Sequence, residues 1–179
     1  MNLLTEVKAV MLVGNPIANS RTRVAADCFT SMLEELGATV TTIDLALMSV
    51  EGLAHGQPDD EARAAVDLVL GCDLLVVVTP IYKATYTGIL KLLFDALRPE
   101  ALTGKVAIPV ILGAGPGHVL VIEHALKPLF AELGAVSPAR GLFVIDKLID
   151  KESRAVDDSV KDGFLRVVHE ATHLIRRRN

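Results

Sequence analysis

Strand-like and helix-like segments alternate along the whole chain, and this alternation is the feature that most limits its possible folds. Apolar runs at Lys8–Val13, Leu74–Val78 and Val106–Leu112 have the composition of strands that are covered on both faces of a parallel sheet. Segments of helical length separate these runs. Because no linker, repeat or low-complexity tract interrupts the alternation, we expect residues 1–179 to form a single domain.

The alternation predicts five strands and five helices. We expect strands at residues 8–13, 38–44, 74–78, 106–112 and 140–145, and helices at residues 20–36, 58–71, 88–97, 119–133 and 157–177. This order predicts an α/β, flavodoxin-like three-layer sandwich, in which a five-stranded parallel sheet has the order 2-1-3-4-5 and helices on both faces. The Thr-rich second strand then lies at a sheet edge. Pro109 predicts a bulge or distortion in the fourth strand, because proline cannot donate to the ladder.

The composition excludes several classes of protein. Hydrophobic residues make up 51% of the chain, which excludes intrinsic disorder. A net charge of -4 and the absence of Trp argue against a basic, base-stacking nucleic-acid surface. Residues 106–122 carry no charge, but Gly113, Gly115, Pro116 and Gly117 interrupt them, so we expect no membrane span. No signal peptide is apparent, and we expect a cytoplasmic protein.

Two of the predicted helices, residues 88–97 and 119–133, lack a polar face. The sheet covers one side of each helix, but the other side would contact water. We therefore expect a homo-oligomer, either a dimer or a tetramer, that forms through these two helices. Burial of the helices under the loop at residues 45–57 is the alternative.

The loop that follows the first strand has the residues of an anion site. Ligands of open α/β sheets bind at the carboxyl ends of the strands, where the strand order reverses. There the loop Gly14–Thr22 offers the hydroxyls of Ser20 and Thr22 and the guanidinium of Arg21. Such donors at a helix start can bind a phosphate monoester. Alternatively, Ser20 is only an N-cap and Arg21 a solvated surface residue.

Two further loops meet the same edge of the predicted sheet. The loop Thr79–Gly88 contains both tyrosines of the chain, with Ile81 and Lys83, and suits a flat heteroaromatic ring. Tyrosines that end a strand with a wet hydroxyl are the alternative. In the loop Gly113–His118, the glycines allow the backbone to approach a ring closely. This loop is not a dinucleotide fingerprint, because His118 stands where the third glycine would fall.

Three stretches carry a resemblance that spans nearly the whole chain in order. They are GNPIANSRT, then TPIYKATYTGILKLLFDAL with the following LTGKVAIPV, and finally GHVLVIEHALKPLFAELGA with the later GLFVID. On these stretches the sequence resembles the NAD(P)H-dependent FMN reductase family, and among its members the FMN reductases of two-component alkanesulfonate monooxygenase systems. The resemblance implies an oligomeric enzyme that binds FMN at the three loops.

The resemblance also implies which residues hold FMN. Asn15, Ser20, Arg21 and Thr22 would bind the phosphate. Pro80, Ile81, Tyr82, Lys83 and Ala84 would line the isoalloxazine ring and the ribityl chain. Gly113, Ala114, Gly115 and His118 would border the ring from the other loop. The chain departs from the family's usual Ser or Gly-Gly pattern at Asn15 and at Gly113-Ala114.

A further departure lies in the helix predicted at residues 119–133. Several of these reductases carry Tyr where this chain has His124, in a widened helical turn at the subunit interface. Pro128 supports a distortion here, because it cannot donate to the carbonyl of His124. We expect His124 to be an interface residue without a chemical role; an influence on flavin retention or assembly is the alternative.

The implied reaction is hydride transfer from the nicotinamide of NADPH or NADH to FMN, which would supply reduced flavin to a partner flavin-dependent monooxygenase. FMN carries this chemistry, so we name no catalytic residue and expect no metal site. The small number of aromatic residues predicts loosely held FMN. The alternatives are a quinone, azo-dye or metal-ion reductase with tightly bound FMN, a flavodoxin-type electron carrier, and a structural module without flavin.

Overall fold

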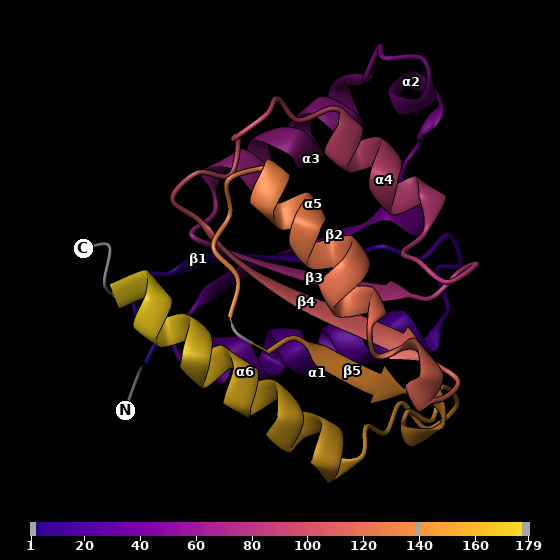
Figure 1. The fold of residues 1–179 in the computed structure, drawn as a ribbon, viewed down its shortest axis with the longest axis vertical. Coiled ribbons are helices and arrows are strands. Elements are labelled where there is room, and N and C mark those ends of the chain that lie inside the picture. Colours follow the sequence, from indigo (N-terminus) through magenta and orange to yellow (C-terminus); the bar gives the residue numbers. More distant parts are fainter. Residues whose placement is uncertain (1–2, 139, 177–179) are drawn as a thin grey trace.

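The computed structural model describes residues 3–138 and 140–176. In this part of the chain, five parallel strands form a central sheet in the order β2-β1-β3-β4-β5, which confirms the predicted topology (Figure 1). The strands are β1 (Lys8–Val13), β2 (Thr39–Asp44), β3 (Leu74–Pro80), β4 (Val106–Gly113) and β5 (Leu142–Ile145).

Helices cover both faces of the sheet and complete three layers (Figure 1). One face carries α1 (Arg21–Glu35) and α6 (Asp158–Arg176), and the other carries α3 (Asp60–Gly71), α4 (Gly88–Asp95) and α5 (Lys127–Glu132). Shorter elements are α2 (Glu51–Ala54), the 3-10 turns η1 (Leu45–Leu47), η2 (Pro116–His118) and η4 (Asp146–Leu148), and the π-helix η3 (Ile122–Leu126). The predicted end of the last helix, Arg177, lies outside the described residues. None of the helices that the structure describes is long and apolar enough to cross a membrane.

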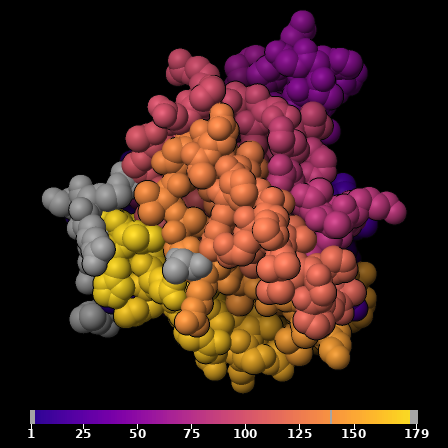
Figure 2. All heavy atoms as spheres, viewed as in Figure 1, coloured from indigo at the N-terminus to yellow at the C-terminus, as the bar shows by residue number. Residues whose placement is uncertain are grey.

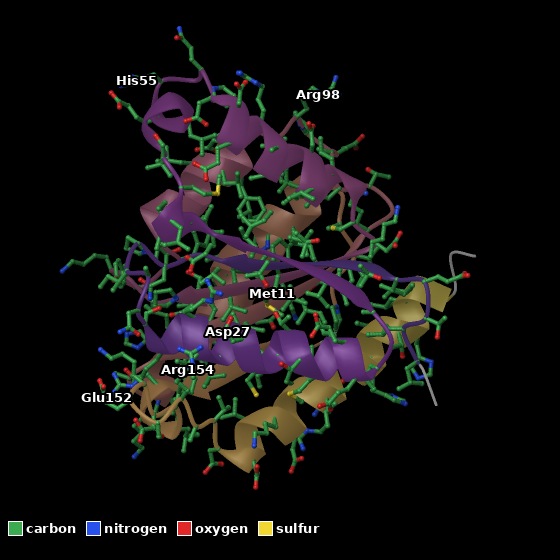
Figure 3. The ribbon with its side chains drawn as sticks, turned by 180° about the vertical axis from the view of Figure 1, so that it is seen from behind. Met11, Asp27, His55, Arg98, Glu152 and Arg154 are labelled. Atoms are coloured by element: carbon green, nitrogen blue, oxygen red, sulfur yellow. The ribbon has the colours of Figure 1, made fainter. Side chains whose placement is uncertain are left out.

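The strands divide their side chains between two apolar cores, one on each face of the sheet. Met11 lies on the α1 and α6 side, where Phe29 and Phe164 stack with ring centroids 4.1 Å apart (Figure 3). On the other side Phe94 of α4 meets Phe130 of α5 edge-on at 6.3 Å. Successive strand residues point to opposite faces, so a strand buried on both faces needs the continuous apolar run that β3 has.

The bulge predicted at Pro109 is absent, and that prediction is wrong. Pairing of β3 with β4 continues without a break, and Pro109 stands opposite Val77. Ala107 donates its N–H to the carbonyl of Val136, on the side of the sheet where β5 lies. Alternate residues direct their backbone groups to the same side, so the nitrogen of Pro109 also faces β5. Because β5 pairs with β4 only from Val110 onward, the sheet has no hydrogen bond at position 109 that would need a backbone N–H.

The helix predicted at residues 119–133 is not one continuous α-helix. Ile122–Leu126 forms a π-helix, in which the N–H of Lys127 donates to the carbonyl of Ile122. Pro128 then lies in the first turn of α5, directly after the π-helix, and cannot donate to a carbonyl of the preceding turn. The distortion predicted from Pro128 and His124 is therefore confirmed, and the helix begins at residue 121 instead of the predicted residue 119.

The polar stretch between β5 and α6 forms a short hairpin at residues 148–157, which the sequence did not predict. Ile149 and Val156 form an antiparallel bridge between its two arms, and both side chains are buried. At the tip, the carboxylate of Asp150 accepts the N–H of Glu152 at 2.9 Å. The hairpin is therefore anchored in the core by its arms and closed by a hydrogen bond at its tip.

Candidate functional site

A cavity of about 430 Å³ lies at the carboxyl ends of the strands, where the fold predicts a ligand site. The loops after β1, β3 and β4 and the segment after β5 contribute to it. Its lining residues are Asn15, Ile17, Asn19, Ser20, Arg21, Thr22, Pro80, Ile81, Tyr82, Leu112, Gly113, Ala114, Asp146 and Lys151. The three loops singled out from the sequence therefore meet at one place.

Most residues that the resemblance assigned to the site line this cavity. They are Asn15, Ser20, Arg21, Thr22, Pro80, Ile81, Tyr82, Gly113 and Ala114. Lys83, Ala84, Gly115 and His118 belong to the same loops but are not among the lining residues. The cavity has five further lining residues that were not predicted: Ile17, Asn19, Leu112, Asp146 and Lys151.

Asn15 shapes the first loop from within. Its side chain is buried, its Nδ2 donates to Thr22 Oγ1 at 3.0 Å, and its Oδ1 accepts the N–H of Ile17 at 2.9 Å. Because the Thr22 oxygen accepts this hydrogen bond, the hydroxyl hydrogen of Thr22 is free to turn toward another acceptor. Asn15 thus acts as a brace that orients Thr22.

The N-terminus of α1 presents unpaired donors to the cavity. Ser20 is the N-cap, and its Oγ accepts the N–H of Arg23 at 3.2 Å. In the described part of the chain, the N–H groups of Arg21 and Thr22 donate to no protein acceptor. Free amides at the positive end of a 15-residue helix favour an anion. The N-cap interpretation of Ser20 is confirmed, and it is compatible with anion binding.

The guanidinium of Arg21 is held at the cavity by a distant segment. Its Nε donates to the carbonyl of Ile149, in the 148–157 hairpin, at 3.0 Å. This bond uses one of the five N–H donors of the arginine and leaves the terminal nitrogens to face a ligand. Arg21 is therefore fixed in place by the fold, although its side chain is exposed.

One carbonyl oxygen joins the first loop to the second. Gly14 O accepts the hydroxyl of Thr87 at 2.7 Å and lies 3.2 Å from the hydroxyl of Thr79, which is also 3.1 Å from the carbonyl of Pro80. Both threonines are almost completely buried, and Thr87 is also the N-cap of α4 through the N–H of Leu90. These hydroxyls fix the end of β1 against the end of β3 and the start of α4. Nothing in the sequence distinguished these two threonines from others.

The second loop continues as a tight turn that projects from the molecule. Tyr82 and Thr85 exchange backbone hydrogen bonds of 2.9 and 3.2 Å, and between them Lys83 and Ala84 have φ angles of 51° and 65°. Left-handed conformations in succession define a type I′ turn, and each costs a non-glycine residue roughly 1–2 kcal/mol. In Figure 2 the segment between β3 and α4 projects at the molecular edge. Tyr82 is 42% exposed there.

The glycines of the third loop have different roles. A Cβ at Gly113 would lie 3.0 Å from side-chain atoms of Ile81 and Phe143, so a side chain there would press on the protein's own packing. A Cβ at Gly115 or Gly117 would meet no atom within 4 Å. The expectation that glycines clear the way for a ring therefore applies to the open part of this loop and not to Gly113.

Comparison with known proteins identifies the family. A family model described as NADPH-dependent FMN reductase matches residues 7–150. The chain belongs to this family. It is 33% identical over 141 residues to the FMN reductase (NADPH) of Pseudomonas putida, which is 78% of this chain and 72% of that protein. It is likewise 33% identical over 150 residues to the Escherichia coli FMN reductase (NADPH), over 83% of this chain and 78% of the relative.

A solved structure of an NADH:FMN oxidoreductase, EmoB in its apo form, has the same fold. It superposes with a TM-score of 0.82 at 29% sequence identity, over 96% of this chain and 89% of the other. The overall likeness, together with the sheet order of this chain, confirms the predicted flavodoxin-like fold class. The suggested family of the sequence analysis is thus confirmed.

The residues of the cavity fit FMN on the structure's own observations. The unpaired amides of Arg21 and Thr22, with the Arg21 guanidinium, supply charge-assisted donors for a phosphate monoester. Beside them, Ile81, Tyr82 and Leu112 supply apolar and aromatic surface for a flat ring. No group of His, Cys, Asp and Glu among the described residues has an arrangement suited to a metal ion. The cavity is thus suited to a phosphorylated ring system.

Proposed function

We propose that this member of the FMN reductase family binds FMN in the cavity at the strand ends and catalyses hydride transfer to it from NADPH or NADH. The observation that carries the proposal is the combination of free amides and Arg21 at one end of the cavity with an exposed aromatic turn at the other. The first feature suits a phosphate, and the second leaves room for a nicotinamide. Family membership supports the same reaction.

The proposed roles of the residues follow from their positions. Ser20, Arg21 and Thr22 would bind the phosphate. Asn15 would orient Thr22 and would not contact the phosphate itself. The proposed ring-side residues that line the cavity are Pro80, Ile81, Tyr82, Gly113 and Ala114. Lys83, Ala84, Gly115 and His118 stay predicted contacts at the rim. We assign no acid, base or nucleophile to the reaction.

The protein's contribution to the reaction is to hold FMN and to orient it toward the nicotinamide. Bound FMN supplies the ring that accepts hydride. The chain anchors the phosphate at α1 and presents Tyr82 and Ile81 beside the ring, so that a nicotinamide can approach the uncovered side. Alignment of this kind accounts for most of the rate enhancement that such enzymes need.

Anaerobic titration tests the proposal directly. We expect the purified protein to quench FMN fluorescence with saturation, and then to oxidise NADPH or NADH only when FMN is present. Colourless purified protein that turns over added FMN would support a diffusible flavin. Yellow protein with ping-pong kinetics toward quinones would instead favour a reductase with retained FMN. Failure to bind FMN would contradict the proposal.

We further propose that copies of the chain associate through α4 and the helical segment at residues 119–133. Phe94 and Phe130 pack α4 against α5 on one face of the sheet. At the start of the 119–133 segment, Val119 and Leu120 are 47% and 59% exposed. Apolar side chains in contact with water favour association. Light scattering on a size-exclusion column would give the number of subunits, and a monomer at micromolar concentration would contradict this proposal.

Three finer assignments stay predictions. They are a partner flavin-dependent monooxygenase of the alkanesulfonate type, a cytoplasmic location, and the folding of residues 1–179 as one FMN-binding domain. The partner assignment has a simple test. If the protein delivers reduced FMN, adding a flavin-dependent monooxygenase of that type should consume NAD(P)H in proportion to the sulfonate oxidised.

A further inference from the structure

The 148–157 hairpin brings a second cation to the cavity. Lys151 lines the cavity together with Arg21, although the two residues lie far apart in the sequence. The link between them is direct, because Ile149, two residues before Lys151, accepts the Nε hydrogen of Arg21 at 3.0 Å. The hairpin therefore positions both cationic side chains of the cavity, because it accepts a hydrogen bond from Arg21 and contains Lys151.

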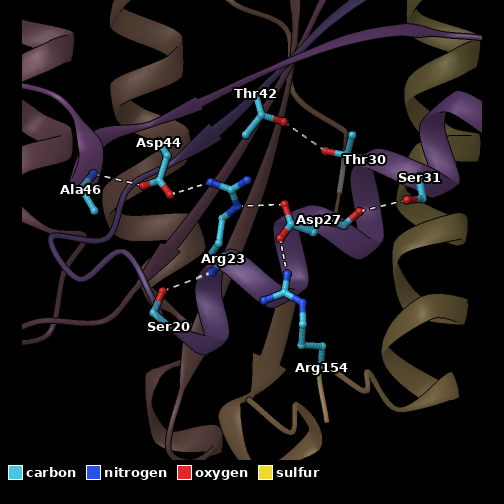
Figure 4. A network of polar contacts seen from close by, with 9 residues as sticks. All are labelled: Ser20, Arg23, Asp27, Thr30, Ser31, Thr42, Asp44, Ala46 and Arg154. Carbon is cyan, nitrogen blue, oxygen red and sulfur yellow. Dashed lines mark hydrogen bonds and ion pairs between the residues drawn. The ribbon is translucent and has the colours of Figure 1, made fainter. Parts of the chain in front are cut away.

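The hairpin is also clamped onto α1 by its tip. Arg154 forms an ion pair with Asp27, and the other oxygen of Asp27 accepts the Nε hydrogen of Arg23 at 2.8 Å (Figure 4). Arg23 in turn bonds Asp44 at 2.9 Å, at the end of β2. Figure 3 shows Asp27, Arg154 and Glu152 grouped at this end of the molecule. The network thus ties the hairpin to α1 and to the sheet.

The local charges decide what Lys151 can bind. Its ammonium lies 3.6 Å from the carboxylate of Glu152, a long ion pair in which the Glu152 side chain is 87% exposed. Such a pair contributes little and is readily exchanged for a better anion. Asp146 is the carboxylate that lines the cavity. Next to Arg21 and the helix N-terminus, a phosphate dianion is the ligand that an additional ammonium would favour.

We propose that Lys151 is a second cationic ligand of the FMN phosphate, and that the Arg154–Asp27 ion pair positions it by holding the hairpin against α1. This inference rests on the proposed function, because it requires that FMN occupies the cavity. Arg154 is a positioning residue in this account: it touches no ligand and acts through the hairpin. Lys151 would then contribute to the preference for FMN over riboflavin, which lacks the phosphate.

Equilibrium binding of FMN and riboflavin, followed by flavin fluorescence at low ionic strength, tests the proposal. We expect Lys151→Met to weaken FMN binding by about 5- to 20-fold, below the full value of a charge-assisted hydrogen bond because the lysine is partly exposed. Riboflavin affinity should stay within about twofold of wild type. The matched control is Lys147→Met, an exposed lysine of η4 that does not line the cavity, and it should change neither affinity.

Salt dependence and a double-mutant cycle separate charge from structure. Loss of a phosphate contact should make FMN affinity less dependent on salt, which a merely structural change would not do. Arg154→Met should weaken FMN binding in the wild-type background by more than it does in the Lys151→Met background, and Arg154→Lys should restore part of the loss. Equal effects of Arg154→Met in the two backgrounds would remove its positioning role.

The outcomes distinguish this inference from the proposed function. If wild-type protein binds no FMN, the proposed function fails. If wild-type protein binds FMN but Lys151→Met leaves the affinity within about twofold, or weakens FMN and riboflavin alike, the inference about Lys151 is wrong. A selective loss of NADPH affinity, with NADH and FMN unaffected, would also overturn it, because the lysine would then bind the 2′-phosphate of the nucleotide.

Discussion

The two ends of the cavity are built in opposite ways. At the phosphate end, formed by Asn15, Ser20, Arg21 and Thr22, the polar side chains are buried or hydrogen-bonded to the protein. At the proposed ring end, the lining residues Tyr82 and Ala114 are exposed, and the turn that carries Tyr82 contains two left-handed residues. The difference teaches that anchoring and access would be separated in space: the side chains are buried or bonded to the protein where we propose that the phosphate binds, and exposed where a nicotinamide would enter.

Removal of the Arg21 charge should have the largest effect, because it acts at the phosphate end. We expect Arg21→Met to weaken FMN binding by about 10- to 100-fold, the value of a charge-assisted hydrogen bond to a phosphate. Fluorescence titration would measure it, with Arg98→Met, an exposed arginine far from the cavity, as the control (Figure 3). An unchanged affinity would show that the phosphate end lies elsewhere.

Loss of the Thr87 hydroxyl should weaken the contact at Gly14 O that joins the loops after β1 and β3. Thr87→Val keeps the shape of the side chain but removes the donor to Gly14 O and the cap of Leu90 N–H. We expect the free energy of unfolding to fall by about 1–2 kcal/mol, measured by urea denaturation. Thr30→Val is the control, since the Thr30 hydroxyl makes only a 3.4 Å contact with Thr42. An equal loss of unfolding free energy in both variants would contradict a special role of the Thr87–Gly14 contact.

The ring end should gain stability when its strain is relieved. Ala84 has a φ of 65°, which glycine adopts without a steric penalty. We expect Ala84→Gly to raise the free energy of unfolding by about 0.5–1 kcal/mol, less than the full strain because glycine also loses more entropy on folding. Ala96→Gly, at an ordinary φ of -77°, should not stabilise the protein. A thermal melt that shows both variants destabilised would refute the strain argument.

Acid should loosen the hairpin only well below neutral pH. Hydrogen bonds from the Ser153 side chain and from the N–H groups of Glu152 and Ser153 lower the pKa of the Asp150 carboxyl below its ordinary value, and Arg21 adds to this. The carboxylate therefore stabilises the hairpin above the ordinary pKa of about 4, and this contribution is lost as the pH falls through the lowered value. A carboxyl titration by NMR should find Asp150 below the ordinary aspartate pKa; a higher value would contradict this.

The sequence predicted the sheet and its order well, because that information is local. Continuous apolar runs such as Leu74–Val78 and the Ser20 cap specify elements without reference to distant residues. Pro109 was misjudged because its effect depends on where β5 begins, which is a property of the pairing and not of the strand itself. The π-helix was foreseen only in part, since Pro128 indicates a distortion but not its kind.

The cavity was predicted where one loop carries the signal, and missed where the fold brings separate segments together. The donors of Ser20, Arg21 and Thr22 are adjacent in the sequence. Asp146 and Lys151 follow β5. Only the rule that parallel strands end at one edge of the sheet would have assigned them to the cavity. The roles of Thr79 and Thr87 depend on a carbonyl more than sixty residues earlier, for which a sequence has no local sign.

The shared carbonyl of Gly14 links three of the segments around the cavity. Three segments meet at this atom: the end of the first strand, the end of the third, and the start of the fourth helix. A shift of α4 away from the end of β1 would lengthen the buried 2.7 Å hydrogen bond from Thr87. A flavin held by its phosphate at α1 would therefore have its ring at a fixed distance from the Tyr82–Thr85 turn.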